Sequence, residues 1–275
     1  MDAESRTNAM STDQVGFLGR ARQMRRITPL YIDRVEVIAA GVRKRVSRLT
    51  YELEEEGFTV SRLHGRTGMS GKEAFFHQGI LFGMNAGILS TRTLLTKFKE
   101  HDVLVHVSEA RASMPRKYIL QAKPKNIWIE NHDSGTKGAM DAIIEASVLR
   151  QKGIQAHVMF DIWHMVHVPN TMESFTTLFD RAVNFLYVHT QNPNGIISGV
   201  HFPIGTQDAL PIDNMSNSQL EFVSSAIGSS IKEVVFENQR RNGLVFLPRS
   251  LENEWFSRTN RIFDRLEKTG ILRTA

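Results

Sequence analysis

Short apolar runs alternate with helical segments along almost the whole chain, and this alternation limits the fold more than any other feature. The runs are rich in β-branched and aromatic residues, which is typical of strands in a sheet. We expect eight such strands, at 15–20, 35–41, 58–65, 103–108, 126–131, 155–164, 195–205 and 232–238. Strands that alternate with helices indicate βα units and a parallel sheet.

The segments between the expected strands carry the periodicity of helices. In 42–56 the apolar residues recur at spacings of four, three and four, which places them on one helix face. We expect further helices at 140–153, 174–189, 218–231 and 250–268. Lys152 and Gly153 are typical of the C-terminal end of a helix. The Gly- and Ser-rich stretch 66–80 and the polar stretch 206–217 each follow a strand and are expected to be loops.

Eight βα units in 275 residues leave about 34 residues for each unit, which is the size of a unit in a (β/α)8 barrel. We therefore predict the α/β class and a single TIM barrel of parallel strands over 13–275, preceded by a flexible tail at 1–12. A doubly wound open sheet is the alternative. Neither G-x-G-x-x-G after the first strand nor G-x-x-x-x-G-K-[ST] occurs, so nucleotide binding through these loops is not supported.

The composition excludes several classes of function. The chain has no cysteine, which excludes disulfides, thiolate nucleophiles, cysteine zinc sites and iron–sulfur clusters. No apolar run approaches the roughly 18 residues of a membrane helix, and the first twelve residues are polar, unlike a signal peptide. We expect a soluble, cytoplasmic protein with no membrane partner. Its oligomeric state, a homo-oligomer included, stays open.

The net charge of +5 comes from 34 Lys and Arg residues against 29 Asp and Glu residues. Since both signs are interspersed along the chain, a solvated surface explains this excess. An anionic partner, either nucleic acid or a phosphorylated substrate, is the other interpretation.

Six successive expected strands have a histidine or a carboxylate at or after their C-terminal ends. The active site of a TIM barrel lies at the C-terminal ends of its strands. The residues are His64, His106, Glu130, Asp161 with His164, His201 with Asp208 in the following loop, and Glu237. A single histidine or carboxylate at a strand end would be an ordinary structural or surface residue, but six such strand ends in succession indicate a site. Glu130 and Glu237 directly follow apolar residues, so their carboxylates are expected to be buried and to need a partner or a metal.

Imidazole and carboxylate side chains without sulfur suit Mn²⁺, Mg²⁺, Co²⁺, Fe²⁺ or Zn²⁺. No H-E-x-x-H occurs, so a zincin protease is not indicated, and no G-x-S-x-G occurs for a serine hydrolase. The strand ends therefore predict a divalent metal site.

The sequence resembles the xylose isomerase-like TIM barrels, which include the sugar phosphate isomerase/epimerase family and the related endonuclease IV family of apurinic-site nucleases. The resemblance covers about 13–270 and depends on four short motifs: WIENH with Glu130, FDIWH with Asp161 and His164, GVHF with His201, and VFEN with Glu237. Together, these motifs imply carbohydrate metabolism as the general area of function.

For an isomerase or epimerase, the resemblance implies that one divalent metal is held by a quartet, Glu130, Asp161, His201 and Glu237. The substrate would be a small sugar or sugar phosphate. A metal that bridges two sugar oxygens acidifies the C–H between them and stabilises the enediolate. The same resemblance assigns the acid and base roles to Glu130 and Glu237. No organic cofactor is then needed.

For an endonuclease IV-like enzyme, the resemblance implies a multi-zinc phosphodiesterase that cleaves DNA at apurinic sites. His64, His106, His164 and Asp208 would hold further metal ions or contact substrate. Two features depart from the families. The loop after His201 reads Asp208-Ala-Leu without the nuclease histidine, and it offers Gln207 and Asp208 where an epimerase has an arginine. A barrel that binds without catalysing is a third alternative.

Overall fold

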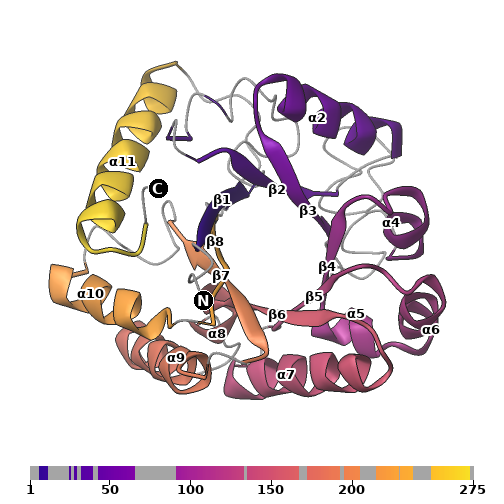
Figure 1. The fold of residues 1–275 in the computed structure, drawn as a ribbon. Helices are drawn as coiled ribbons and strands as arrows, with labels where there is room; N and C mark the ends of the chain where they lie inside the picture. The colour runs from indigo at the N-terminus through magenta and orange to yellow at the C-terminus, as the bar shows by residue number, and fades with distance from the viewer. Residues whose placement is uncertain are drawn as a thin grey trace, which may run out of the picture.

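A computed structural model of the chain describes residues 6–11, 25, 28–29, 32–39, 43–65, 91–132, 135–166, 172–192, 195–204, 215–228, 230–237 and 249–272. Eight parallel strands follow one another around a closed barrel, and the last pairs with the first (Figure 1). They are β1 Thr7–Ser11, β2 Arg34–Ile38, β3 Thr59–Gly65, β4 Asp102–His106, β5 Ile127–Glu130, β6 Ala156–Asp161, β7 Ile197–Pro203 and β8 Glu233–Glu237. The predicted (β/α)8 barrel is confirmed.

Helices form a ring outside the strands (Figure 1). They are α2 Arg43–Glu55, α4 Thr91–Lys97, α5 Val107–Arg111, α6 Ser113–Ala122, α7 Gly135–Gln151, α8 Ile162–Val166, α9 Phe175–Thr190, α10 Asn217–Ala226 and α11 Arg249–Lys268. The five helices expected from periodicity are confirmed as α2, α7, α9, α10 and α11, with some ends shifted. Among the described helices, none combines the length and apolar character that a membrane crossing requires.

The first strand lies where we expected a flexible tail. β1 pairs in parallel with both β2 and β8, and most of it is buried. The prediction that 1–12 is a tail is therefore wrong for Thr7–Ser11, because closure of the barrel needs this segment as a strand. The range 15–20, where we expected the first strand, lies outside the described residues, as do 66–80 and 205–214.

Local sequence signals set several helix ends. α7 ends at Gln151, and Gly153 follows with a φ of 77°, in the left-handed region that glycine adopts without strain. The start of α10 is fixed by Ser216 and Gln219, whose side chains each bond to the other's main-chain N–H in a capping box.

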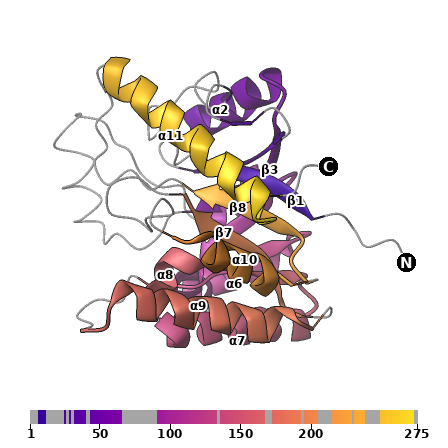
Figure 2. The ribbon, with the colours of Figure 1, turned by 90° about the vertical axis from the view of Figure 1, so that its left-hand side faces the viewer.

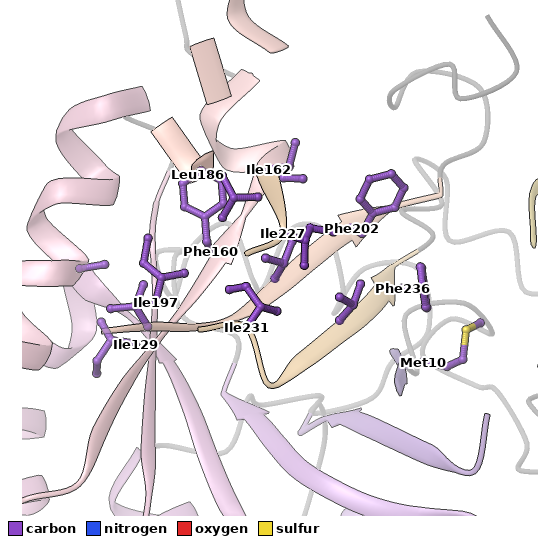
Figure 3. Close-up of a cluster of buried hydrophobic side chains, with 14 of the residues drawn as sticks. Met10, Ile129, Phe160, Ile162, Leu186, Ile197, Phe202, Ile227, Ile231 and Phe236 are labelled. Carbon is purple, nitrogen blue, oxygen red and sulfur yellow. The ribbon is translucent and has the colours of Figure 1, made fainter. Parts of the chain in front are cut away.

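The two faces of each strand bury different residues, because successive side chains of a strand point to opposite sides. On β8, Val234 and Phe236 pack into the large apolar core between strands and helices, whereas Val235 belongs to a separate small cluster. Figure 3 shows part of the large core, where Phe236 lies near Phe202 of β7 with ring centroids 6.2 Å apart. Outside this part of the barrel, α9 and α10 lie side by side (Figure 2).

The small cluster fills the middle of the barrel with Ala9, Leu104, Trp128, Met159 and Val235. By the alternation of the strands, the residues two positions further along point to the same interior. They include His106, Glu130, Asp161 and Glu237, all of which are buried. The interior therefore changes from apolar to polar toward the C-terminal ends of the strands, where the candidate site lies.

Candidate metal centre

Four of the predicted site residues end their strands. His106, Glu130, Asp161 and Glu237 are the last residues of β4, β5, β6 and β8. Because all the strands are parallel, these residues meet at one rim of the barrel. Glu130 and Asp161 are each 1% exposed and Glu237 is 4% exposed, which places three carboxylates almost wholly out of water.

The remaining predicted histidines lie at the same rim. His64 is the penultimate residue of β3, and His201 of β7 is in register with Asp161. His164 lies on α8, which follows β6 directly. The structure thus brings seven of the eight predicted residues together, while Asp208 lies outside the described residues.

Glu130 is the centre of the cluster. Its Oε1 lies 2.7 Å from His201 Nδ1, and its Oε2 lies 2.8 Å from His106 Nε2 and 3.0 Å from His64 Nε2. His201 Nδ1 is also 3.5 Å from Glu237 Oε1. One carboxylate therefore faces three imidazoles from three different strands.

The side chains form three overlapping groups that could each hold a metal ion, since the ligand atoms within each group lie within 4.8 Å of one another. The groups are His64, His106 and Glu130; Glu130, Asp161 and His164; and Glu36, His201 and Glu237. Glu130 belongs to two of them, so it could bridge two adjacent metal positions.

The hydrogen bonding of the carboxylates fits a metal. Asp161 Oδ1 accepts from the main-chain N–H of Trp163 at 2.6 Å, whereas the buried Asp161 Oδ2 has no hydrogen bond within the described part of the chain. The same is true of Glu130 Oε2, whose close imidazole contacts lack hydrogen-bond geometry, and of His64 Nε2. Buried polar atoms without a hydrogen bond are costly unless something else coordinates them. A divalent cation among these oxygen and nitrogen donors would do so.

The charges of the cluster compensate one another. Burial alone would raise the pKa of Glu130, but the charges of His64, His106 and His201 lower it well below its usual value. Burial alone would lower the pKa of His64, but Glu130 and Glu36 raise it to about 10. Without a metal, protons on His64 and His201 therefore offset the charges of Glu130 and Glu36. Metal ions can replace such protons, because ligands bind metal in their deprotonated form.

Two other carboxylates of the cluster have a raised pKa, whereas the pKa of Glu130 is lowered. Burial raises the pKa of Glu237 to about 8, and although His201 opposes this shift, the charges of Asp161 and Glu130 add to it. Burial also raises the pKa of Asp161, against the charge of His164. At these two carboxylates burial thus outweighs the nearby imidazoles, and shifted pKa values of this kind are typical of a functional site.

We did not identify Glu36, which occupies the middle of β2 and contacts two of the site histidines. It is flanked by Val35 and Val37, both fully buried, so the signal that drew attention to Glu130 was also present here. His132 was also missed as a site residue. Its ring lies 5.9 Å from that of His164 and 5.8 Å from that of His106.

No protein-family model matches the sequence, and no curated protein matches it. Solved structures do match over nearly the whole chain. A xylose isomerase domain-containing protein from Salmonella typhimurium is 13% identical, with 97% of this chain and 99% of that chain covered and a TM-score of 0.53. An L-ribulose 3-epimerase is 12% identical, with 96% of each chain covered and a TM-score of 0.52. The chain therefore shares the fold of these two proteins.

Proposed function

We propose that the chain is a divalent-metal-dependent isomerase or epimerase that acts on a sugar or sugar phosphate. The observation that carries this proposal is the meeting of Glu130, Asp161, His201 and Glu237 at one buried rim, with oxygens of Glu130 and Asp161 left without a hydrogen bond among the described residues. The fold shared with an L-ribulose 3-epimerase supports the same class of reaction. No organic cofactor forms part of the proposal.

In this function the quartet would hold the metal, and its imidazole and carboxylate ligands suit Mn²⁺, Mg²⁺, Co²⁺ or Zn²⁺. When bound, the metal supplies Lewis-acid chemistry that makes the C–H between two adjacent sugar oxygens more acidic. Glu130 and Glu237 then move the proton. Their Oε1 atoms lie 2.7 and 3.5 Å from the same nitrogen of His201, so two carboxylates from different strands border one small space. One takes the proton and the other returns it, as general acid–base catalysis requires.

Metal analysis of the purified protein tests the site. We expect one bound divalent ion per chain in the wild type, and its loss in Glu130→Ala, Asp161→Ala, His201→Ala and Glu237→Ala. Glu145→Gln is the matched control, because Glu145 is also buried but pairs with Arg111 and Arg116 on the outer helices. Wild-type metal content in all four site variants would refute the assignment.

Exchange of carbon-bound hydrogen with solvent tests the reaction. In D₂O, the metal-loaded enzyme should introduce deuterium into a ketose or ketose phosphate from a panel of such sugars, detected by NMR. Glu130→Gln and Glu237→Gln should abolish the exchange, because each removes a proton carrier. A metal-loaded protein that exchanges no sugar in the panel would contradict the proposed reaction but leave the metal site standing.

A multi-zinc apurinic-site endonuclease is the second candidate, and the group of His64, His106 and Glu130 favours it. This group could hold a second ion next to the quartet, with Glu130 as the bridge. Neighbouring metal ions suit phosphodiester hydrolysis, since they stabilise the attacking and leaving oxygens together. Two or three Zn²⁺ per chain and chelator-sensitive cleavage of abasic duplex DNA would establish this function, whereas a single ion and intact DNA favour the isomerase.

A further inference from the structure

Glu36 contacts two histidines of the candidate metal centre at once. It is fully buried in the middle of β2. Its Oε1 lies 3.1 Å from His64 Nδ1, and its Oε2 lies 3.1 Å from His201 Nε2. Both oxygens are therefore engaged by imidazole nitrogens, which is the arrangement of a carboxylate that supports ligands from behind.

The other nitrogen of each imidazole points toward Glu130. His64 Nε2 lies 3.0 Å from Glu130 Oε2, and His201 Nδ1 lies 2.7 Å from Glu130 Oε1. Each ring thus has one nitrogen on the side of Glu36 and one on the side of the candidate ligands. Once a metal has replaced the second proton of each ring, the neutral imidazole carries a single N–H, and an N–H directed at Glu36 leaves the lone pair on the side of the candidate ligands.

Arg62 holds Glu36 in place. Its guanidinium is buried, and its Nε lies 3.6 Å from Glu36 Oε2. It also packs on the Trp128 ring, 4.1 Å from the centroid, and pairs with Glu233 further down the barrel. A fixed positive charge behind Glu36 favours the ionised carboxylate, which can only accept hydrogen bonds.

We propose that Glu36 is a positioning residue that fixes opposite tautomers in two histidines, Nδ1–H in His64 and Nε2–H in His201. The lone pairs of both rings are then directed to the side of Glu130. His201 belongs to the proposed quartet and His64 to the neighbouring group with His106 and Glu130, so one carboxylate orients imidazoles on both sides of Glu130. This inference rests on the proposed metal-dependent function.

Glu36→Gln provides the test, because glutamine keeps the shape but has only one acceptor oxygen. Its amide –NH₂ must face His64 Nδ1 or His201 Nε2, so that ring is forced to turn an N–H toward the metal side. We expect the dissociation constant for Zn²⁺, measured by competition with a chromophoric chelator, to rise about 10- to 100-fold. Nitrogen-15 NMR of histidine-labelled, zinc-loaded protein should show one of the two tautomers reversed.

Glu233→Gln is the matched control. Glu233 is a buried carboxylate that contacts the same Arg62, but its ion pairs are with Arg62 and Arg34 and not with the site. It should leave the zinc affinity and both tautomers unchanged. The proposal is overturned if Glu36→Gln binds zinc as the wild type does, or if Glu233→Gln weakens binding equally.

If Glu36→Gln does not fold, the histidine tautomers of the wild type still test the proposal. Its zinc-loaded form must show His64 protonated at Nδ1 and His201 at Nε2, and any other pair of tautomers overturns the proposal. A wild type that binds no divalent metal refutes the proposed function itself, which separates that failure from a failure of the role of Glu36.

Discussion

The side-chain amide of Asn131 is bonded on both sides to the main chain of Asp161. Its Nδ2 donates to the Asp161 carbonyl at 2.9 Å, and the Asp161 N–H donates to its Oδ1 at 2.7 Å. Asn131 is fully buried and follows Glu130 directly, so this pair of bonds ties the end of β5 to the end of β6. The relative position of two proposed metal ligands therefore depends on an amide that binds no metal itself.

Replacing this amide should weaken both the fold and the site. Asn131→Ala leaves the N–H and carbonyl of Asp161 without these partners, and each unsatisfied buried group costs about 1–3 kcal/mol. Urea unfolding should show this loss, and metal titration should show weaker binding. Asn126→Ala is the control, because Asn126 precedes β5 at its other end and donates to Asp102 at 3.0 Å in a partly exposed position. Unchanged metal affinity in Asn131→Ala would show that the amide does not position the ligands.

A bound metal should raise the unfolding temperature. A ligand at 100 times its dissociation constant stabilises a folded protein by about 2.7 kcal/mol, which corresponds to roughly 5–10 °C for a chain of this size. Chelator should remove this increment from the wild type and from the control Glu145→Gln. In Glu237→Ala, thermal unfolding should be the same with and without metal, since the quartet has lost a ligand. Equal metal-induced shifts in this variant and the wild type would exclude Glu237 as a ligand.

The sequence predicted β2 to β8 well, because each of them is a clear apolar run, and β3 to β8 carry a polar residue of the site at or near their C-terminal ends. It failed at β1. The segment Thr7–Ser11 has only Ala9 and Met10 as apolar residues, and Asn8 and Ser11 are buried by their neighbours in the barrel. Burial of this kind depends on barrel closure and leaves no local pattern.

The sequence predicted those residues of the candidate site that lie at the C-terminal ends of strands. Residues at the C-terminal ends of parallel strands must converge, so Glu130, Asp161 and Glu237 could be grouped without a structure. Glu36 stands between two valines like a buried carboxylate, but it lies two residues before the end of β2, so a search of strand ends does not select it, and its contacts with His64 and His201 place it in the site. Such contacts depend on the register between neighbouring strands of the barrel, and the sequence pattern does not predict this register.

Removing the buried charge of Arg62 should cost far more stability than removing an exposed charge. It is buried between two carboxylates, Glu36 and Glu233, and removal of one partner from a buried ion pair typically costs about 3–5 kcal/mol. Urea unfolding of Arg62→Met should show a loss of this size. Adding Glu233→Gln should recover part of it, because one of the two carboxylates that lost the charge of Arg62 is then neutral. In contrast, Arg48→Met removes an exposed helix pair with Glu52 and should cost no more than about 0.5 kcal/mol. A loss for Arg62→Met as small as that for Arg48→Met would contradict this prediction.

His157 should make the protein less stable in mild acid. Burial, with the nearby charges of Arg150 and Lys232, lowers the pKa of His157 to about 4, whereas an unfolded histidine has a pKa of about 6.5. Between these values the unfolded chain binds a proton that the folded chain does not, so the free energy of unfolding falls as the pH drops from about 6.5 to 4. Above pH 6.5 both states are neutral at this ring and the effect vanishes.

Urea unfolding at pH 7.5 and pH 5 measures this dependence, and His157→Gln should reduce the difference between the two values. His157 Nδ1 lies 3.2 Å from Ser198 Oγ, so loss of that contact must be separated from loss of the titrating ring. Ser198→Ala serves this purpose, because it removes the hydroxyl but leaves the buried imidazole. It should lower stability at both pH values and keep the wild-type difference between them. If His157→Gln also keeps that difference, His157 does not cause the acid sensitivity, and the buried carboxylates and histidines of the metal centre become its source.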